Sequence, residues 1–267
     1  MQQPTVSIII PCYNSGQYLT DALNSVKTYP DQSILEVIII DDGSSEQVTI
    51  DLLNKLKAEY TVLRQENKGP AAARNAGVKI AKSEFLLFLD SDNKIRKEYI
   101  EKGLTVLTSR LDISIIHGKP VFFGDTAEPR FDTGPFDLDK ILKQNYIDTC
   151  VVMRKSTWQA LNGQDEDRRI IGHEDWDFWI RAAEAGYQFK YLDEVLFEYR
   201  ISASSLVKPS MQIGGNQTIM AYMYGKHALL VNRQYTRLYN LLNIYKDDQR
   251  RPLRSFIKFA YHKYFRK

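Results

Sequence analysis

Short apolar runs alternate with amphipathic stretches over the first hundred residues of the chain. Residues 6–10, 37–40 and 85–89 are apolar runs rich in β-branched and aromatic side chains, which predicts buried strands, and a weaker strand is predicted near 60–64. Between these runs, apolar side chains recur at helical spacing. The three stripes are Leu19, Ala22, Leu23 and Val26; Leu52, Leu53 and Leu56; and Ala72, Ala76 and Ile80. This alternation predicts right-handed βαβ units, and hence an α/β fold with a Rossmann-like, mostly parallel central sheet and helices on both faces.

The second half of the chain has a mixed pattern. Strands are predicted at 113–117, 119–123, 149–154 and 195–201. A helix is predicted over 174–186, with the apolar stripe Trp176, Trp179, Ile180 and Ala183 and with Gly186 at its end. From residue 211 onward the pattern is helical. We therefore expect one domain over residues 1–210, followed by a C-terminal helical region over 211–267.

Polar clusters follow three of the predicted strands. Residues 11–14 follow the first strand, residues 41–45 the second, and residues 90–93 the fourth. In an open parallel sheet, ligands bind outside the carboxyl ends of the strands. The three clusters therefore predict a single binding site at one edge of the sheet.

Asp90 and Asp92 lie two residues apart, directly after a predicted strand. At such a turn both carboxylates can reach one hard divalent cation, Mg²⁺ or Mn²⁺, which takes oxygen ligands and bridges phosphate oxygens. The cation would neutralise charge on a departing diphosphate. The alternative is structural, because Asp92 could instead cap a helix that begins at Ile95.

Two further acidic pairs allow both a structural and a functional interpretation. Asp41 and Asp42 precede a glycine and a serine, so they suit a turn, but a second acid there could also bind a base imide or a ribose hydroxyl. Glu174 and Asp175 open a predicted helix, where the helix dipole favours acids. Either one could instead be a general base that takes a proton from an attacking hydroxyl. Trp176, which lies next to them in the sequence, could raise the pKa of such a base by desolvation, stack on a sugar or fill the core.

Composition contributes mainly exclusions. The 267 residues are 43% hydrophobic and 26% charged, which is ordinary for a folded domain, and the net charge of +3 is too small to indicate a nucleic-acid partner. Two cysteines without a CxxC pair fit a reducing, cytoplasmic compartment. No signal peptide or membrane-spanning run is recognised. The four histidines lack zinc-site spacing, and no Walker A or GxGxxG motif is present.

Together these motifs resemble glycosyltransferase family 2, the large group with the GT-A fold. The resemblance covers residues 6–205, and it depends on several motifs in the expected order. They are SIIIPCYN (7–14), IIIDDGS (38–44), NKGPAAARN (67–75), FLDSD (88–92), HED (173–175) and YR (199–200). Within a catalytic domain over 1–210, it implies a nucleotide-binding half over about 1–110 and an acceptor half over about 111–210.

The resemblance also implies roles for matching residues on the donor side. Tyr13 and Asp42 would hold the nucleobase, with Pro11 lining that pocket. Arg74 would help to hold the donor near Asp90. Asp90 would contact the ribose or the sugar, and Ser91 would bind the nucleotide sugar. Asp92 would ligate the metal, Mn²⁺ or Mg²⁺.

On the acceptor side, the resemblance implies that Asp175 is the catalytic base and Glu174 its neighbour, with His173 and Trp176 beside the acceptor. The family inverts the anomeric configuration by direct displacement, so one base suffices. The implied reaction moves a sugar from a UDP-sugar, with UDP-glucose as the first expectation, to a saccharide or a lipid-linked saccharide in polysaccharide or glycan synthesis.

The sequence departs from the family pattern at Ser202. Family members often carry a histidine two residues after the Tyr-Arg pair, in a loop that helps to bind metal and diphosphate. Serine is a poor metal ligand but a good phosphate hydrogen-bond donor. We therefore count Ser202 among the candidate donor-binding residues, and the alternative is that it belongs to a solvated loop.

The C-terminal residues 250–267 carry seven lysines and arginines and no acid, with apolar side chains at helical spacing. A basic amphipathic helix of this kind can lie on an anionic membrane surface, which would suit a lipid-linked acceptor at the inner face of the membrane. The alternative is a helix that packs on the domain and exposes a basic face.

Two other functions fit parts of the sequence. A sugar-nucleotide nucleotidyltransferase shares a similar sheet and uses metal, but it would show a Gly-rich, basic loop after the first strand, and residues 11–16 do not. A non-catalytic module with the same fold is the other possibility. The presence of Asp92 and Asp175 argues against it.

Overall fold

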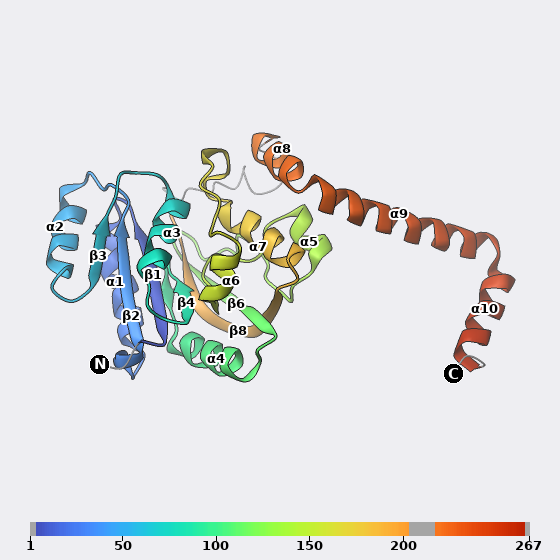
Figure 1. The fold of residues 1–267 in the computed structure, drawn as a ribbon, viewed down its shortest axis with the longest axis horizontal. Coiled ribbons are helices and arrows are strands. Elements are labelled where there is room, and N and C mark those ends of the chain that lie inside the picture. The colour runs from blue at the N-terminus through green and yellow to red at the C-terminus, as the bar shows by residue number, and fades with distance from the viewer. Residues whose placement is uncertain (1–3, 203–216, 265–267) are drawn as a thin grey trace. The chain divides into compact units, whose positions relative to one another are not determined.

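The computed structural model describes residues 4–202 and 217–264. The chain forms two compact units, Met1–Tyr222 and Met223–Lys267. The predicted boundary at residue 210 falls outside the described residues. The first unit contains the central sheet and the helices that cover it, and the second consists of helical segments (Figure 1).

One eight-stranded sheet, with strand order β3-β2-β1-β4-β7-β6-β8-β5, organises the first unit. Its strands are β1 (Val6–Cys12), β2 (Leu35–Asp41), β3 (Thr61–Arg64), β4 (Phe85–Phe88), β5 (Lys94–Ile95), β6 (Ile113–Gly124), β7 (Val152–Arg154) and β8 (Gln188–Ile201). The first four strands pair in parallel, as do β6 and β8, whereas β7 runs antiparallel to both of its neighbours and β5 is antiparallel to β8. The predicted α/β fold with a mostly parallel sheet is confirmed.

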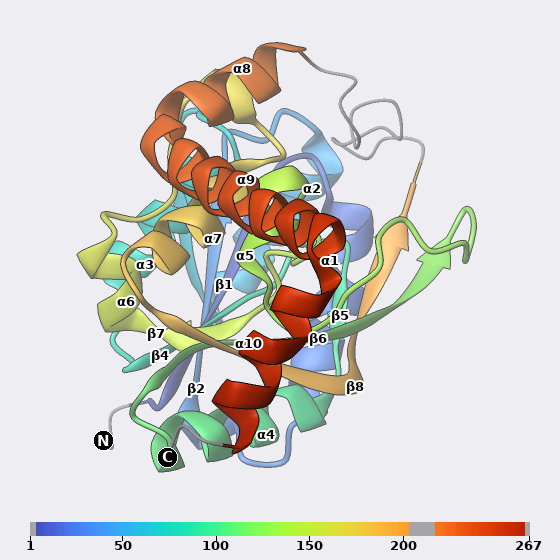
Figure 2. The ribbon, with the colours of Figure 1, turned by 90° about the vertical axis from the view of Figure 1, so that its right-hand side faces the viewer.

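Helices form where the apolar stripes predicted them, and the structure adds three that no such pattern predicted, over 97–109, 138–143 and 155–160. The helices are α1 (Gly16–Lys27), α2 (Gln47–Leu56), α3 (Pro70–Ile80), α4 (Lys97–Ser109), α5 (Leu138–Lys143), α6 (Lys155–Ala160), α7 (Glu174–Glu184), α8 (Gln217–Lys226), α9 (Ala228–Arg250) and α10 (Pro252–Tyr264), with short 3₁₀ turns at Gln32–Ile34 and Arg168–Ile170. Figure 2 shows α3 and α6 on one side of the sheet and α1 on the other, so both faces are covered.

The core on the α1 side joins the two halves of the sheet. Ile8 and Ile10 of β1 pack in one cluster with Leu19 of α1 and Tyr99 of α4, and all four are fully buried. Burying each such aliphatic side chain contributes roughly 1.5–3 kcal/mol. The Tyr99 hydroxyl donates to the carbonyl oxygen of Cys150 at 2.6 Å, so its polar atom is satisfied inside this core.

On the other face, the buried stripe of α3 differs from the predicted one. Ala72 is buried as expected, but Ile80 is 38% exposed, and Gly77 faces the sheet instead. A Cβ atom at Gly77 would lie 2.5 Å from Cγ2 of Ile9, so the helix approaches β1 more closely than a side chain would allow. Periodicity alone could not choose between two neighbouring faces rich in small residues.

Three strands have different bounds from those predicted. The separate strands at 113–117 and 119–123 form the single strand β6, which passes through Gly118 with a shift in register against β8. β8 begins at Gln188, because it pairs with β6 over most of its length. β7 begins only at Val152 and not at Thr149, since the preceding segment is bound by a side chain at the site described below.

Candidate active site

A cavity of about 740 Å³ opens at the carboxyl ends of β1, β2 and β4. Its volume is in the range of small-molecule sites. Every site residue predicted from the sequence lines this cavity. They are Pro11, Tyr13, Asp42, Arg74, Asp90, Ser91, Asp92, His173, Glu174, Asp175, Trp176 and Ser202. The prediction of one site at one sheet edge is therefore consistent with the geometry.

Asp42 follows β2 and organises the loop that leads to α3. Its buried carboxylate accepts from Nε2 of Gln65 at 2.8 Å, and from the backbone N–H groups of Lys68 at 2.9 Å and Gly69 at 2.8 Å. Gly69 has φ of 93°, which glycine adopts readily. Tyr13, by contrast, is half exposed at the cavity wall, where its ring is open to a ligand.

Arg74 lies on α3 and is buried between two carboxylates. Its Nη2 donates to Oδ1 of Asp90 at 2.6 Å, and its Nη1 donates to Oε1 of Glu174 at 2.8 Å. Burial opposes the positive charge, but Asp90 and Glu174 outweigh it and hold the pKa of Arg74 above its usual value. The second carboxylate oxygen of Glu174 accepts from the N–H of Gly172 at 2.6 Å, so both of its oxygens are bound.

The turn after β4 presents Asp92 to the cavity. Burial and the nearby charge of Asp90 raise the pKa of Asp92 to about 6, partly offset by Arg200. α4 begins at Lys97 with Arg96 as its N-cap, so the interpretation of Asp92 as a helix cap is wrong. Ser91 is linked to the loop after β1, with 2.6 Å between its Oγ and that of Ser15.

The Asp92 carboxylate suits a hard divalent cation. Among the described residues, no group of three or more histidine, cysteine or acidic side chains is arranged to hold a metal. Mg²⁺, however, commonly binds through one or two carboxylates, with waters and substrate phosphates completing the shell. A partly buried carboxylate with a raised pKa, in a cavity large enough for a diphosphate, fits that mode.

Arg200, which we did not predict as a site residue, holds this turn in place. Its Nε donates to the carbonyl oxygen of Asp92 at 3.0 Å, and its backbone N–H donates to Oδ1 of Asn93 at 2.8 Å. Its guanidinium lies 4.3 Å from the ring centroid of Tyr18. Ser202 follows two residues later and lines the cavity.

Asp175 occupies the first turn of α7, directly after Glu174, which Arg74 bridges to Asp90. Its Oδ1 accepts from the N–H of Trp176 at 2.7 Å. Burial raises the pKa of Asp175 well above its usual value, helped by the neighbouring charges of Glu174 and Asp148. A carboxylate with a raised pKa accepts a proton more readily than an ordinary carboxylate, which suits a general base.

The two predicted acceptor-side residues differ in what they offer. His173 is buried, and burial lowers its pKa, so the imidazole is neutral. Its Nε2 has no hydrogen-bond partner among the described residues. Trp176 is only 4% exposed, and its Nε1 donates to the carbonyl oxygen of Ile141, so most of its ring belongs to the core. Trp179 is also buried, with Nε1 donating to Ile147.

Sequence reasoning missed Asp148, which lines the same cavity. Burial and the charges of Asp90 and Asp92 raise the pKa of Asp148 to about 7, against the opposing effect of Arg74. The residue belongs to none of the motifs. The sequence did offer one signal for it: Asp148 directly precedes residues 149–154, which were predicted to form a strand.

A mostly parallel sheet whose carboxyl edge gathers an Asp-x-Asp turn, a buried arginine and a helix-borne carboxylate defines the class of GT-A glycosyltransferases. Residues 7–161 match the sequence profile of glycosyl transferase family 2. The chain belongs to this family. EpsH of Bacillus subtilis, assigned as a glycosyltransferase, is 29% identical over 223 residues, which cover 78% of this chain and 64% of EpsH. The chain thus spans less than two-thirds of that relative.

Solved structures share the fold. S. aureus TarS 1–349 in complex with UDP-GlcNAc superposes with a TM-score of 0.62 at 21% identity, covering 84% of this chain and 72% of the TarS 1–349 chain. The mannosyltransferase PcManGT from Pyrobaculum calidifontis, in complex with GDP-Man and Mn²⁺, superposes with a TM-score of 0.60 at 17% identity. The match covers 76% of this chain and 59% of the PcManGT chain. At these identities the likeness establishes the fold.

Proposed function

We propose that the protein transfers a sugar from a UDP-sugar to a saccharide or lipid-linked saccharide, with inversion at the anomeric carbon. The observation that carries the proposal is that Asp92 and Asp175 line one cavity, where Arg74 bridges Asp90 of the Asp92 turn to Glu174, the neighbour of Asp175. One carboxylate suits the diphosphate end of a donor and the other suits an attacking hydroxyl.

The donor would lie along the ends of the first strands. Tyr13, Pro11 and Asp42 would surround the base, with Asp42 acting both through its carboxylate and through the loop that it holds. Arg74 and Asp90 would face the ribose or the sugar, while Ser91 and Ser202 offer hydroxyl groups to the diphosphate. TarS binds UDP-GlcNAc, which supports a UDP-sugar, and UDP-glucose is our first candidate.

Asp175 would act as the general base. Its carboxylate takes the proton from the acceptor hydroxyl, the acceptor oxygen bonds to the anomeric carbon, and the bond from that carbon to the diphosphate oxygen breaks. The electron pair leaves with UDP, and one displacement inverts the configuration. When bound at Asp92, Mn²⁺ or Mg²⁺ would neutralise the diphosphate charge. Glu174, bound by Arg74 and Gly172, positions its neighbour.

Mn²⁺ in the PcManGT complex supports the metal assignment, and the similarity to TarS, a poly(ribitol-phosphate) β-N-acetylglucosaminyltransferase, supports a polymeric acceptor. A nucleotidyltransferase would instead need a basic loop after β1. The residues that line the cavity there are Pro11, Cys12, Tyr13, Asn14 and Ser15, none of which is basic.

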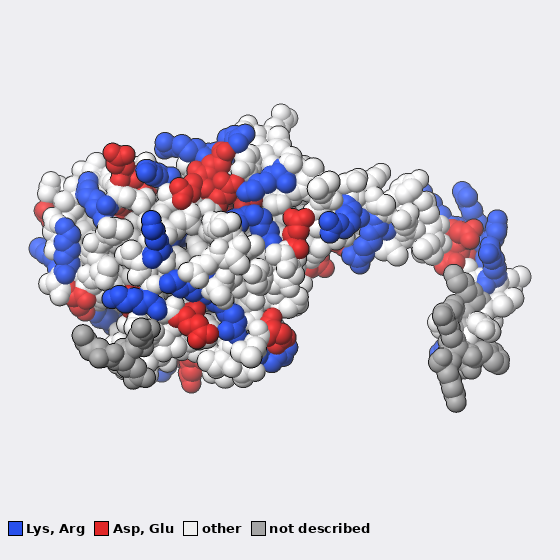
Figure 3. Space-filling model, in the orientation of Figure 1, with Lys and Arg blue, Asp and Glu red and all other residues white. Residues whose placement is uncertain are grey.

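We also propose that the second unit binds the anionic inner face of a membrane. Of the 36 lysines and arginines, 11 lie in residues 223–267 with two of the 33 acids, a formal charge of +9, and residues 1–222 carry −6. Figure 3 shows basic side chains along α9 and at its junction with α10. Each cation near such a surface contributes roughly 1 kcal/mol.

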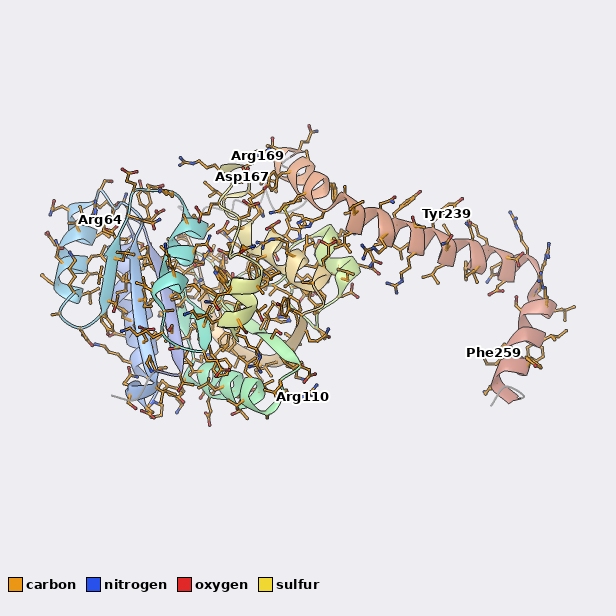
Figure 4. All side chains as sticks on the ribbon, in the orientation of Figure 1. Arg64, Arg110, Asp167, Arg169, Tyr239 and Phe259 are labelled. Atoms are coloured by element: carbon orange, nitrogen blue, oxygen red, sulfur yellow. The ribbon has the colours of Figure 1, made fainter. Side chains whose placement is uncertain are left out.

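Aromatic side chains on the same helices supply the apolar component. Tyr239 of α9 and Phe259 of α10 are 53% and 60% exposed, and both extend from their helices in Figure 4. Aromatic rings and cations together suit the interfacial region of a bilayer. Within 4–202 and 217–264, no helix is long and apolar enough to cross a membrane.

A thermal-shift panel tests the proposed donor. UDP and UDP-sugars should raise the melting temperature in the presence of Mn²⁺, because a ligand that binds only the folded state stabilises it. Asp92→Asn should lose the part of the shift that depends on Mn²⁺, whereas Asp139→Asn, at an exposed site on α5 outside the cavity, should keep it. Pyrophosphate release from UTP and a sugar phosphate, without any UDP-sugar shift, would contradict the proposal.

A further inference from the structure

Asp148 is held rigidly in the wall of the cavity. Its Oδ1 accepts from the N–H of Cys150 at 2.8 Å, in the segment that leads into β7. On one side, the carbonyl oxygen of Ile147 accepts from Nε1 of Trp179 at 2.9 Å. On the other, the carbonyl oxygen of Cys150 accepts from the Tyr99 hydroxyl. The bond from Cys150 fixes the carboxylate itself, and the bonds from Trp179 of α7 and Tyr99 of α4 fix the backbone on either side of it.

Asp148 lies near both the proposed metal-side carboxylates and the proposed base. Asp148 is close enough to Asp90 and Asp92 for their charges to raise its pKa, and its own charge raises that of Asp175. It also contributes to raising the pKa of Tyr199, another residue of the cavity wall. In a single displacement the anomeric carbon lies between the diphosphate and the base. Asp148 lines the same cavity as Asp92 and Asp175, so it borders the space in which the sugar ring would lie.

Two further side chains of the cavity wall each carry a buried polar atom. Thr149 and His173 line the cavity, and they are 5% and 7% exposed. Thr149 Oγ1 and His173 Nε2 have no hydrogen-bond partner among the described residues. A buried polar atom without a partner costs free energy, so a bound molecule that supplies the missing partners is favoured there.

We propose that Asp148 contacts the transferred sugar and restricts the donor to nucleoside diphosphates of uncharged sugars, excluding uronic acids. This inference rests on the proposed donor site. The carboxylate accepts a hydrogen bond from a sugar hydroxyl, and it repels a sugar that carries its own carboxylate. Arg74 cannot offset that repulsion, because it already bridges Asp90 and Glu174.

Calorimetric titration with UDP, UDP-glucose and UDP-glucuronate in the presence of Mn²⁺ tests the inference. It is done at pH 8.5, above the pKa of about 7 for Asp148. The wild-type protein should bind UDP-glucuronate about tenfold or more weakly than UDP-glucose, since like charges at close range repel strongly in a partly buried site. Asp148→Asn keeps an oxygen for Cys150 and should bring the two affinities within about threefold. UDP itself should bind both proteins equally.

Asp137→Asn is the matched control, because Asp137 also accepts a backbone N–H, from Lys140 at 2.8 Å, but lies outside the cavity. It should leave the tenfold ratio unchanged. Equal binding of the two donors by the wild type, or the same ratio in Asp148→Asn, would overturn the inference while the UDP site stands. Tighter binding of UDP-glucuronate would overturn it too, and would indicate Arg130, which also lines the cavity. No binding of UDP at all would overturn the donor site itself.

Discussion

Arg74 and Glu174, 100 residues apart in the chain, form a buried ion pair with 2.8 Å between Nη1 and Oε1. The pair joins α3, which follows the loop held by Asp42, to the first residue of α7. The next residue of α7 is Asp175. Because Arg74 also binds Asp90, one guanidinium sets the spacing between the metal-side turn and the proposed base.

Glu174→Gln should therefore weaken both stability and turnover. The substitution leaves the buried Arg74 paired with Asp90 alone. We expect a loss of about 2–4 kcal/mol in the free energy of unfolding, somewhat below the roughly 3–5 kcal/mol for a buried pair that is fully broken. Urea denaturation measures this loss, and UDP release measures turnover. Asp112→Asn breaks the exposed pair of Asp112 with Arg110 and should change neither. Equal stability of Glu174→Gln and the wild type would show that the bridge is not structural.

Asp175→Asn should abolish turnover and spare donor binding. General-base catalysis contributes typically 10²- to 10⁴-fold, so we expect a fall of about 10³-fold in kcat. The amide keeps an oxygen that can accept from the N–H of Trp176, so the start of α7 should be unchanged. Calorimetry with UDP and Mn²⁺ serves as the control for an intact donor site. Turnover at the wild-type rate would remove Asp175 from the mechanism.

Much of the fold follows from local sequence pattern, and so does the location of the site. The runs that became β1, β2 and β4 are apolar enough to specify buried strands, and their polar ends meet at one edge because parallel strands share a direction. The pairing of β6 with β8 could not be predicted, since it joins residues such as Ile116 and Lys190 that lie far apart in the chain. Asp148 was missed for the same reason: its neighbours Asp90 and Asp175 come from other segments.

Gly77→Ala should destabilise the first unit, although alanine favours helices. The added Cβ would lie 2.5 Å from Cγ2 of Ile9, so α3 or β1 must shift, at a cost of about 1–3 kcal/mol. Gly225→Ala in α8 is the control, because among the described residues no atom beyond its own stretch of helix lies within 4 Å of the added Cβ. There the substitution should be neutral or stabilising by about 0.5–1 kcal/mol. Thermal unfolding of both variants gives the comparison, and an unchanged melting temperature for Gly77→Ala would show that β1 adapts.

Deleting residues 250–267 should reduce binding to anionic vesicles. Those residues carry seven of the eleven cations of the second unit, so flotation with phosphatidylglycerol vesicles should fall steeply and should depend on salt. Phe256→Asp with Phe259→Asp removes two exposed rings and should weaken binding at constant chain length. Neutral phosphatidylcholine vesicles are the control, with weak binding expected for every variant. Full binding after the deletion would contradict the membrane proposal.

His117 should make the stability of the protein depend on pH. The side chain is 2% exposed beside the rings of Phe189 and Tyr191, and burial lowers its pKa to about 4. In the unfolded chain an unperturbed histidine has a pKa of about 6.5, so between these values the unfolded state binds a proton that the folded state does not. The stabilisation is complete above pH 6.5 and is lost as the pH falls towards 4, by about 3 kcal/mol in total.

His117→Phe tests this dependence, since an apolar ring of similar size suits a position whose two ring nitrogens have no hydrogen-bond partner among the described residues. Urea midpoints at pH 7.5 and pH 5.0 should differ less in the variant than in the wild type. His173 is also buried with a lowered pKa, so some dependence should persist in the variant. The same difference in both proteins would mean that His117 takes up its proton in the folded state as readily as in the unfolded one. The packing around β6 would then have to open at mildly acidic pH, because a charged imidazole cannot remain between those rings without water.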